Sequence, residues 1–122
     1  MLDHVTIGVT DLERSKVFYD AALLPLGITR LYADGETFVG YGAKGRAFFW
    51  IGLRDHEGTG VHIAFVAEDR ATVEAFYKAA LGAGGRDNGP PGLRPRYHPH
   101  YYGGFVLDPD GHNIEAVCRA AG

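Results

Sequence analysis

The chain has 122 residues, of which 46% are hydrophobic and 22% are charged, with a formal net charge of −3 and a single cysteine. These values are typical of one globular domain and argue against a binding surface for nucleic acid or for an anionic membrane. No apolar stretch approaches the roughly 20 residues of a membrane-spanning helix, and no signal peptide precedes the first predicted strand. We therefore expect a cytoplasmic protein without an intrachain disulfide.

The first half of the chain is predicted to form a strand, a helix and three further strands. Polar and apolar residues alternate over residues 2–9, which places His4 and Thr6 on one face of the first strand. Asp11 is a candidate N-cap for a helix over residues 12–24. The three strands that follow are separated by turn residues and cover residues 29–32, 37–41 and 47–53.

The second half repeats this order after a polar linker at residues 54–60. Its first strand carries His62 on the face opposite to its apolar side chains, and Asp69 is the candidate N-cap of its helix. The elements of this half are a strand over residues 61–66, a helix over 70–81, an irregular segment over 84–99 and two strands over 101–107 and 113–119.

The two halves are copies of one unit. A shift of 58 residues aligns residues 4–27 with residues 62–85, and eight of the 24 aligned positions are identical, including His4 with His62. Such a repeat predicts a single α+β domain over residues 1–122, built from two modules at about 1–55 and 60–119. If the modules pack around a pseudo-twofold axis, the two histidines come close to one cleft.

A glutamate in the last strand is the third candidate of a metal site. Glu115 is flanked by apolar residues, and a carboxylate is costly to bury there without a partner. Two imidazoles and one carboxylate suit Fe²⁺, Mn²⁺, Ni²⁺ or Zn²⁺. Alternatively, backbone carbonyls satisfy the histidines, and Glu115 pairs with Arg46 or another arginine. The symmetric placement of His4 and His62 favours the metal site.

The duplicated strand–helix–three-strand unit, the histidine that opens each half and the run Asp108-Pro109-Asp110-Gly111-His112-Asn113-Ile114-Glu115 resemble the vicinal oxygen chelate superfamily. This superfamily includes glyoxalase I, extradiol dioxygenases and the fosfomycin- and bleomycin-resistance proteins. The resemblance implies two tandem modules that form a cupped, mostly antiparallel, eight-stranded sheet. It also implies one divalent metal ion, bound by His4, His62 and Glu115, which chelates oxygens of a small substrate. Small members are usually homodimers, and the sequence leaves open whether the modules pair within a chain or between chains.

Departures from the known members leave the reaction open among lyase, isomerase, transferase and dioxygenase chemistry. Glyoxalase I takes a further acidic or amide ligand from the strand equivalent to residues 47–53, which has none here. The extradiol dioxygenase signature has a tyrosine where this chain has Phe105. The fosfomycin-resistance transferases use a serine-rich loop, whereas this chain has one serine, Ser15.

Residues around the implied cup are candidates for acid–base chemistry and for substrate contact. The segment from Arg94 to Tyr102 combines prolines, aromatic residues, arginines and histidines, and it could equally be a solvated loop or a dimer contact. His56 and His112 are expected to be exposed linker and turn residues. The candidate acids or bases are His98, His100 and Tyr101, and the candidate pocket residues are Thr6, Phe48, Trp50, Arg96 and Tyr102, although strand aromatics are more often plain core.

Two functions follow from these features. The first is a metal-dependent enzyme that acts on a small oxygenated molecule. The alternative is a binding protein of the bleomycin-resistance type, which sequesters a flat aromatic ligand without chemistry. Aromatic residues at the cup and the missing second carboxylate favour the alternative, and the histidine pair with Glu115 favours the enzyme.

Overall fold

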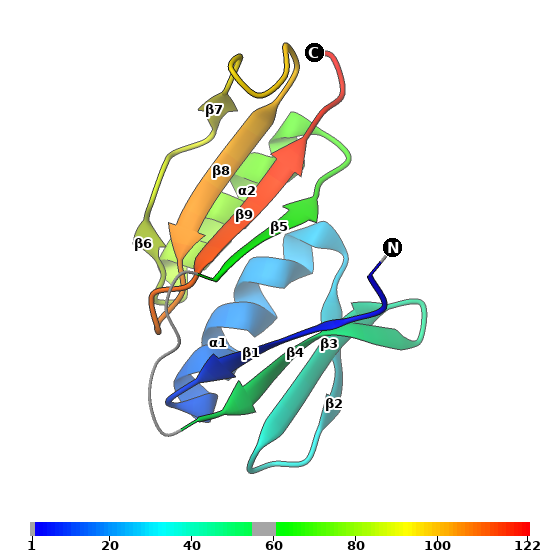
Figure 1. The fold of residues 1–122 in the computed structure, drawn as a ribbon, viewed down its shortest axis with the longest axis vertical. Coiled ribbons are helices and arrows are strands. Elements are labelled where there is room, and N and C mark those ends of the chain that lie inside the picture. Colours follow the sequence, from blue (N-terminus) through cyan, green and yellow to red (C-terminus); the bar gives the residue numbers. More distant parts are fainter. Residues whose placement is uncertain (1, 55–60) are drawn as a thin grey trace.

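The computed structural model describes residues 2–54 and 61–122, which we call the first and the second module. Each module has one sheet and one α-helix (Figure 1). The predicted linker covers residues 54–60 and includes His56. Of this linker, residues 55–60 lie outside the described residues. The first module contains β1 (Val5–Val9), α1 (Leu12–Leu23), the short 3₁₀ helix η1 (Leu24–Leu26), β2 (Thr29–Ala33), β3 (Phe38–Ala43) and β4 (Arg46–Leu53). The second contains β5 (His62–Val66), α2 (Arg70–Gly82), β6 (Arg86–Asp87), β7 (Gly92–Leu93), β8 (Tyr102–Leu107) and β9 (Asn113–Cys118).

Both helices begin at the aspartates that the sequence indicates. Oδ1 of Asp11 accepts a 3.1 Å hydrogen bond from the amide of Arg14, and Oδ1 of Asp69 accepts one of 2.8 Å from Thr72. Each bond satisfies an amide of the first helical turn that has no partner within the helix. The first helix tightens into η1 and stops at Gly27, whose φ of 77° suits glycine.

The described strands form two mixed sheets, which confirms the α+β class. Their orders are β1-β4-β3-β2 and β5-β9-β8-β6, with β7 also paired to β8. In each sheet the first strand of the module pairs in parallel with the last strand, and the other pairs are antiparallel. The two short strands β6 and β7 arise within the segment expected to be irregular.

In the described part of the chain, the two sheets remain separate and do not join into one eight-stranded sheet. The strands β1 and β5 are the facing edges of the two sheets, and α1 lies between them in Figure 1. The two edge strands also point in opposite directions in this view. Among the described residues, no backbone pairing joins β1 to β5, and the two sheets meet through side chains such as Phe49 and Phe65.

One hydrophobic core is shared by both modules. Apolar residues from β1, β4, β5, β9 and both helices belong to a single buried cluster, and α1 contacts α2. The rings of Phe49 on β4 and Phe65 on β5 meet edge to face, with centroids 5.2 Å apart. Such contact across the junction holds the two modules together through apolar burial. Over residues 2–54 and 61–122, no helix combines the length and hydropathy that crossing a bilayer requires.

Candidate functional site

Glu115 and His62 lie on the face of the second sheet that points away from the core. The strand register places Glu115 between Ala64 of β5 and Phe105 of β8. His62 is two residues before Ala64 and therefore lies on the same face. Ile114 and Ala116, which flank Glu115 in β9, point to the opposite face and are buried in the core. The alternation of side chains along β9 therefore places Glu115 on the face away from the core.

The two side chains are in direct contact. Nε2 of His62 lies 2.8 Å from Oε1 of Glu115. The carboxylate side chain is 1% exposed, whereas the imidazole is 51% exposed and can be reached from solvent. Arg46, which the sequence offered as an alternative partner of Glu115, instead binds Oδ2 of Asp3 at 2.6 Å.

Tyr101 contacts the other oxygen of the same carboxylate. Its hydroxyl donates a hydrogen bond to Oε2 of Glu115. Removal from water, together with the hydrogen bond to Glu115 and its negative charge, raises the pKa of Tyr101 to about 12. The phenol therefore stays protonated near neutral pH and acts as a hydrogen-bond donor.

Gly103 leaves space for this contact. A Cβ atom at this position would lie 3.2 Å from Oε2 of Glu115 and 3.1 Å from the ring of Tyr101. These distances are tighter than ordinary van der Waals contact. A side chain at this position would therefore require the ring of Tyr101 and the carboxylate of Glu115 to shift by a small amount.

His4 is separate from the pair formed by His62 and Glu115. It lies one residue before β1, its side chain is 56% exposed, and its Nδ1 is 2.8 Å from Oδ1 of Asp3. The starts of β1 and β5 lie at opposite ends of the gap between the sheets (Figure 1). No three His, Cys, Asp or Glu side chains gather into a metal-sized group in the part of the chain that the structure describes.

A hollow of about 530 Å³ lies on the open face of the first sheet, next to His4. Thr6 and Trp50 are paired in the register of β1 and β4, and both line it. The ring of Tyr32 lies 5.6 Å from that of Trp50 and extends the aromatic wall. Phe48 lines a second cleft of about 500 Å³ between the modules.

The remaining candidates of the Arg94–Tyr102 segment bind their own neighbours. Arg96 donates a 3.0 Å hydrogen bond to the hydroxyl of Tyr97 and covers its ring. Nδ1 of His98 accepts a 3.0 Å bond from the amide of His100. Tyr102 lies on the helix side of β8, where its hydroxyl donates to Glu74 of α2. Among the named acid and base candidates in the described chain, only Tyr101 contacts Glu115.

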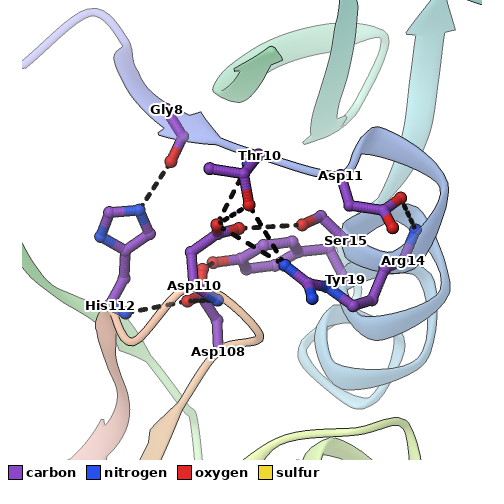
Figure 2. Close-up of polar contacts among 9 residues, drawn as sticks. All are labelled: Gly8, Thr10, Asp11, Arg14, Ser15, Tyr19, Asp108, Asp110 and His112. Carbon is purple, nitrogen blue, oxygen red and sulfur yellow. Dashed lines mark hydrogen bonds and ion pairs between the residues drawn. The ribbon is translucent and has the colours of Figure 1, made fainter. Parts of the chain in front are cut away.

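A buried polar cluster, which the sequence did not indicate, joins the two modules (Figure 2). We call it the inter-module clasp, and it connects β1 and α1 to the turn between β8 and β9. The expectation that His112 is exposed is wrong, because it is 1% exposed and its Nε2 lies 2.7 Å from the carbonyl oxygen of Gly8. Its contact with Gly8 joins the turn to the first module. The side chains of the clasp are Thr10, Ser15, Tyr19, Asp108, Asp110 and His112.

The acids of the clasp are held by donors from the first module. Oδ1 of Asp110 accepts hydrogen bonds from the amide of Thr10, at 3.1 Å, and from its hydroxyl, at 2.6 Å. Burial raises the pKa of Asp108, although the hydroxyl of Tyr19 and backbone amides oppose this rise. These contacts fix the position of the turn that immediately precedes β9, the strand that carries Glu115.

The chain is similar to known proteins in sequence and in structure. The family model of the Glyoxalase/Bleomycin resistance protein/Dioxygenase superfamily matches residues 1–116. A glyoxalase/bleomycin resistance protein from Albidiferax ferrireducens T118 is 34% identical, with a TM-score of 0.85 over 97% of this chain and 98% of that one. No curated protein matches the sequence.

More distant structures share the fold. A glyoxalase-related enzyme from Fulvimarina pelagi is 22% identical, with a TM-score of 0.73 over 97% of this chain and 87% of that one. A mutant of the fosfomycin resistance protein FosX from Listeria monocytogenes is 19% identical, with a TM-score of 0.72 over 96% of this chain and 88% of that one. That FosX structure is a complex with Mn(II) and 1S,2S-dihydroxypropylphosphonic acid.

Proposed function

The chain belongs to the Glyoxalase/Bleomycin resistance protein/Dioxygenase superfamily, and we propose that it is a divalent-metal-dependent enzyme acting on a small oxygenated substrate. The observation that carries this proposal is the contact between Nε2 of His62 and Oε1 of Glu115 on the open face of the second sheet. A bound divalent cation supplies Lewis-acid polarisation of substrate oxygens.

The donor atoms of this pair suit one coordination sphere. Metal–nitrogen and metal–oxygen bonds of about 2.0–2.2 Å at right angles put neighbouring donor atoms about 3 Å apart. The observed separation of 2.8 Å is close to this value. An imidazole and a carboxylate suit Fe²⁺, Mn²⁺, Ni²⁺ and Zn²⁺, and a cation would take the place of the proton that His62 and Glu115 share.

His4 would join this site from a second copy of the chain. Over the residues that the structure describes, it lies apart from the pair of His62 and Glu115, and the edges β1 and β5 have no strand partner on their outer side. A homodimer in which the first sheet of one copy faces the second sheet of the other would bring the three side chains together. It would also place the hollow beside Trp50 next to the metal, as a wall for an apolar part of the substrate.

A binding protein without chemistry is the second candidate. The observation that favours it is the hollow of about 530 Å³ with its wall of Tyr32 and Trp50. Flat aromatic compounds stack well on such side chains. This function needs no metal, so the dependence of binding on metal separates the two proposals.

The test is the metal content of tag-free protein purified without chelators, measured by elemental mass spectrometry. We expect about one metal ion per chain in the wild type and none in His62→Ala or Glu115→Ala. The matched control is His98→Ala, which removes an imidazole from the same module that does not contact Glu115 and should retain the metal. Wild-type protein that stays metal-free after reconstitution would refute the enzyme proposal and support the binding protein.

A further inference from the structure

We propose that Tyr101 is a positioning residue that makes Glu115 a one-oxygen metal ligand. This inference rests on the proposed metal site and goes beyond it, because it assigns a role to a side chain outside the ligand set. Tyr101 holds Oε2 of Glu115, while Oε1 is left beside Nε2 of His62.

The two carboxylate oxygens have different partners. Oε1 lies beside a half-exposed imidazole, so a cation that displaces the hydrogen bond between them binds Nε2 and Oε1 together. Oε2 accepts the hydrogen bond from the phenol of Tyr101, a residue that is only 8% exposed. The side chain of Glu115 is itself 1% exposed, so water does not compete for Oε2. The phenol therefore determines which oxygen remains free.

The position of Tyr101 is fixed by its surroundings. The guanidinium of Arg119 lies 5.0 Å from its ring centroid, and the ring of Tyr97 packs against it at 5.1 Å. Its amide donates to the carbonyl of His98 at 3.1 Å, and its carbonyl accepts from the amide of Arg94 at 2.8 Å. Outer partners of this kind orient metal ligands before the metal arrives.

A one-oxygen ligand has a consequence for substrate binding. If Glu115 used both oxygens, it would occupy two coordination positions instead of one. Holding Oε2 away keeps the second position open for a substrate oxygen. Loss of the phenol hydroxyl frees Oε2 to bind the cation together with Oε1, at the expense of that open position.

The experiment compares Tyr101→Phe with Tyr97→Phe, which removes a phenol hydroxyl from the adjacent ring without touching Glu115. Co(II) is titrated into each metal-free protein, and affinity and visible absorption are recorded. We expect Tyr101→Phe to bind Co(II) about 10- to 100-fold more weakly, because losing the orientation of Glu115 costs more affinity than the added bond from Oε2 supplies. Its absorption should also weaken, because a higher coordination number lowers the intensity of cobalt bands. Tyr97→Phe should match the wild type in both readouts.

The outcomes separate the two proposals. Wild-type protein that binds no Co(II) overturns the metal site and this inference with it. If the wild type binds Co(II) and Tyr101→Phe matches it in affinity and spectrum, only the role of Tyr101 is refuted. A Mn²⁺-loaded crystal structure of the wild type gives a check that does not depend on the folding of any variant. One-oxygen binding by Glu115 with Oε2 on Tyr101 supports the inference, and two-oxygen binding overturns it.

Discussion

The hydroxyl of Tyr19 donates a 2.6 Å hydrogen bond to Oδ2 of Asp108, which lies 89 residues further along the chain. Both side chains are fully buried, and the bond connects α1 to the turn before β9. The modules are thus joined by two kinds of contact. The inter-module clasp is polar, and the contact of Phe49 with Phe65 is apolar. Through this clasp, the first module supports the strand that carries Glu115.

Replacement of Tyr19 by phenylalanine should destabilise the protein. The variant keeps the ring but leaves Oδ2 of Asp108 buried without its donor, which costs about 1–3 kcal/mol. Urea unfolding followed by circular dichroism measures the change in the free energy of unfolding. Tyr97→Phe, at an exposed position, is the control and should change it by less than about 0.5 kcal/mol. Equal stability of wild type and Tyr19→Phe would mean that this hydrogen bond contributes nothing to stability.

Stability should fall steeply at alkaline pH. Burial, followed by the charge of a neighbouring aspartate, raises the pKa of Tyr19 well above its usual value and likewise raises that of Tyr41. The folded protein thus keeps both phenols protonated, while the unfolded chain ionises above pH of about 10. The stability that they contribute is complete below pH of about 10 and is lost as the pH rises further, by about 1.4 kcal/mol per pH unit for each phenol.

The measurement for this pH dependence is urea unfolding of wild type and Tyr19→Phe between pH 8 and 11. Since the variant lacks one of the buried phenols, its free energy of unfolding should fall less steeply above pH 10. Parallel curves for the two proteins would show that Tyr19 does not titrate differently in the folded and unfolded states.

Features set by local sequence could be predicted well. Asp11 and Asp69 cap the helices because an aspartate before an amphipathic run satisfies free amides nearby, whatever the rest of the fold does. The alternation of residues also predicted that His62 lies on the face of its strand opposite to Ile63 and Phe65. Which strands pair was not predicted, and the observed pairing of β5 with β9 brings His62 and Glu115 to one face of the second sheet.

Features set by contact between the modules could not be predicted in this way. The repeat relates His4 to His62 by symmetry, but symmetry does not state whether the two meet within one chain or across two. His112 lies in a polar turn sequence, which indicates exposure. Its contact with the carbonyl of Gly8, 104 residues away, depends on the packing of the two modules. Tyr101 was one of several candidates, because its distance from Glu115 depends on how the preceding segment folds over the sheet.

Trp50 offers a direct signal for ligand binding. It is the single tryptophan of the chain and it lines the hollow beside His4, so tryptophan fluorescence, excited where tyrosine does not absorb, reports on that hollow. We expect aromatic or oxygenated ligands that bind there to quench this fluorescence in a saturable way. For the enzyme, quenching should require added Mn²⁺ or Zn²⁺ and disappear in Glu115→Ala. Saturable quenching of metal-free protein would instead support the binding protein.

If the metal site is shared between two copies, two variants that each fail to bind metal should recover metal binding when they form a mixed dimer. In a dimer of His4→Ala with His62→Ala, one site would lose both histidines, but the other would keep His4 from one copy and His62 with Glu115 from the other. Two differently tagged variants are co-expressed, the heterodimer is purified through both tags, and its metal content is measured. We expect about one tightly bound metal ion per heterodimer, and none in either variant alone.

The same measurement tests the competing arrangement within one chain. If His4 and His62 of a single chain formed the site, each chain of the heterodimer would lack one histidine, and metal binding would not recover. Pairing the His4→Ala chain with a second His4→Ala chain through the same two tags controls for the tagging itself, because both sites then lack His4. Recovery in the mixed heterodimer but not in this control therefore requires a site that takes His4 from one copy and Glu115 from the other.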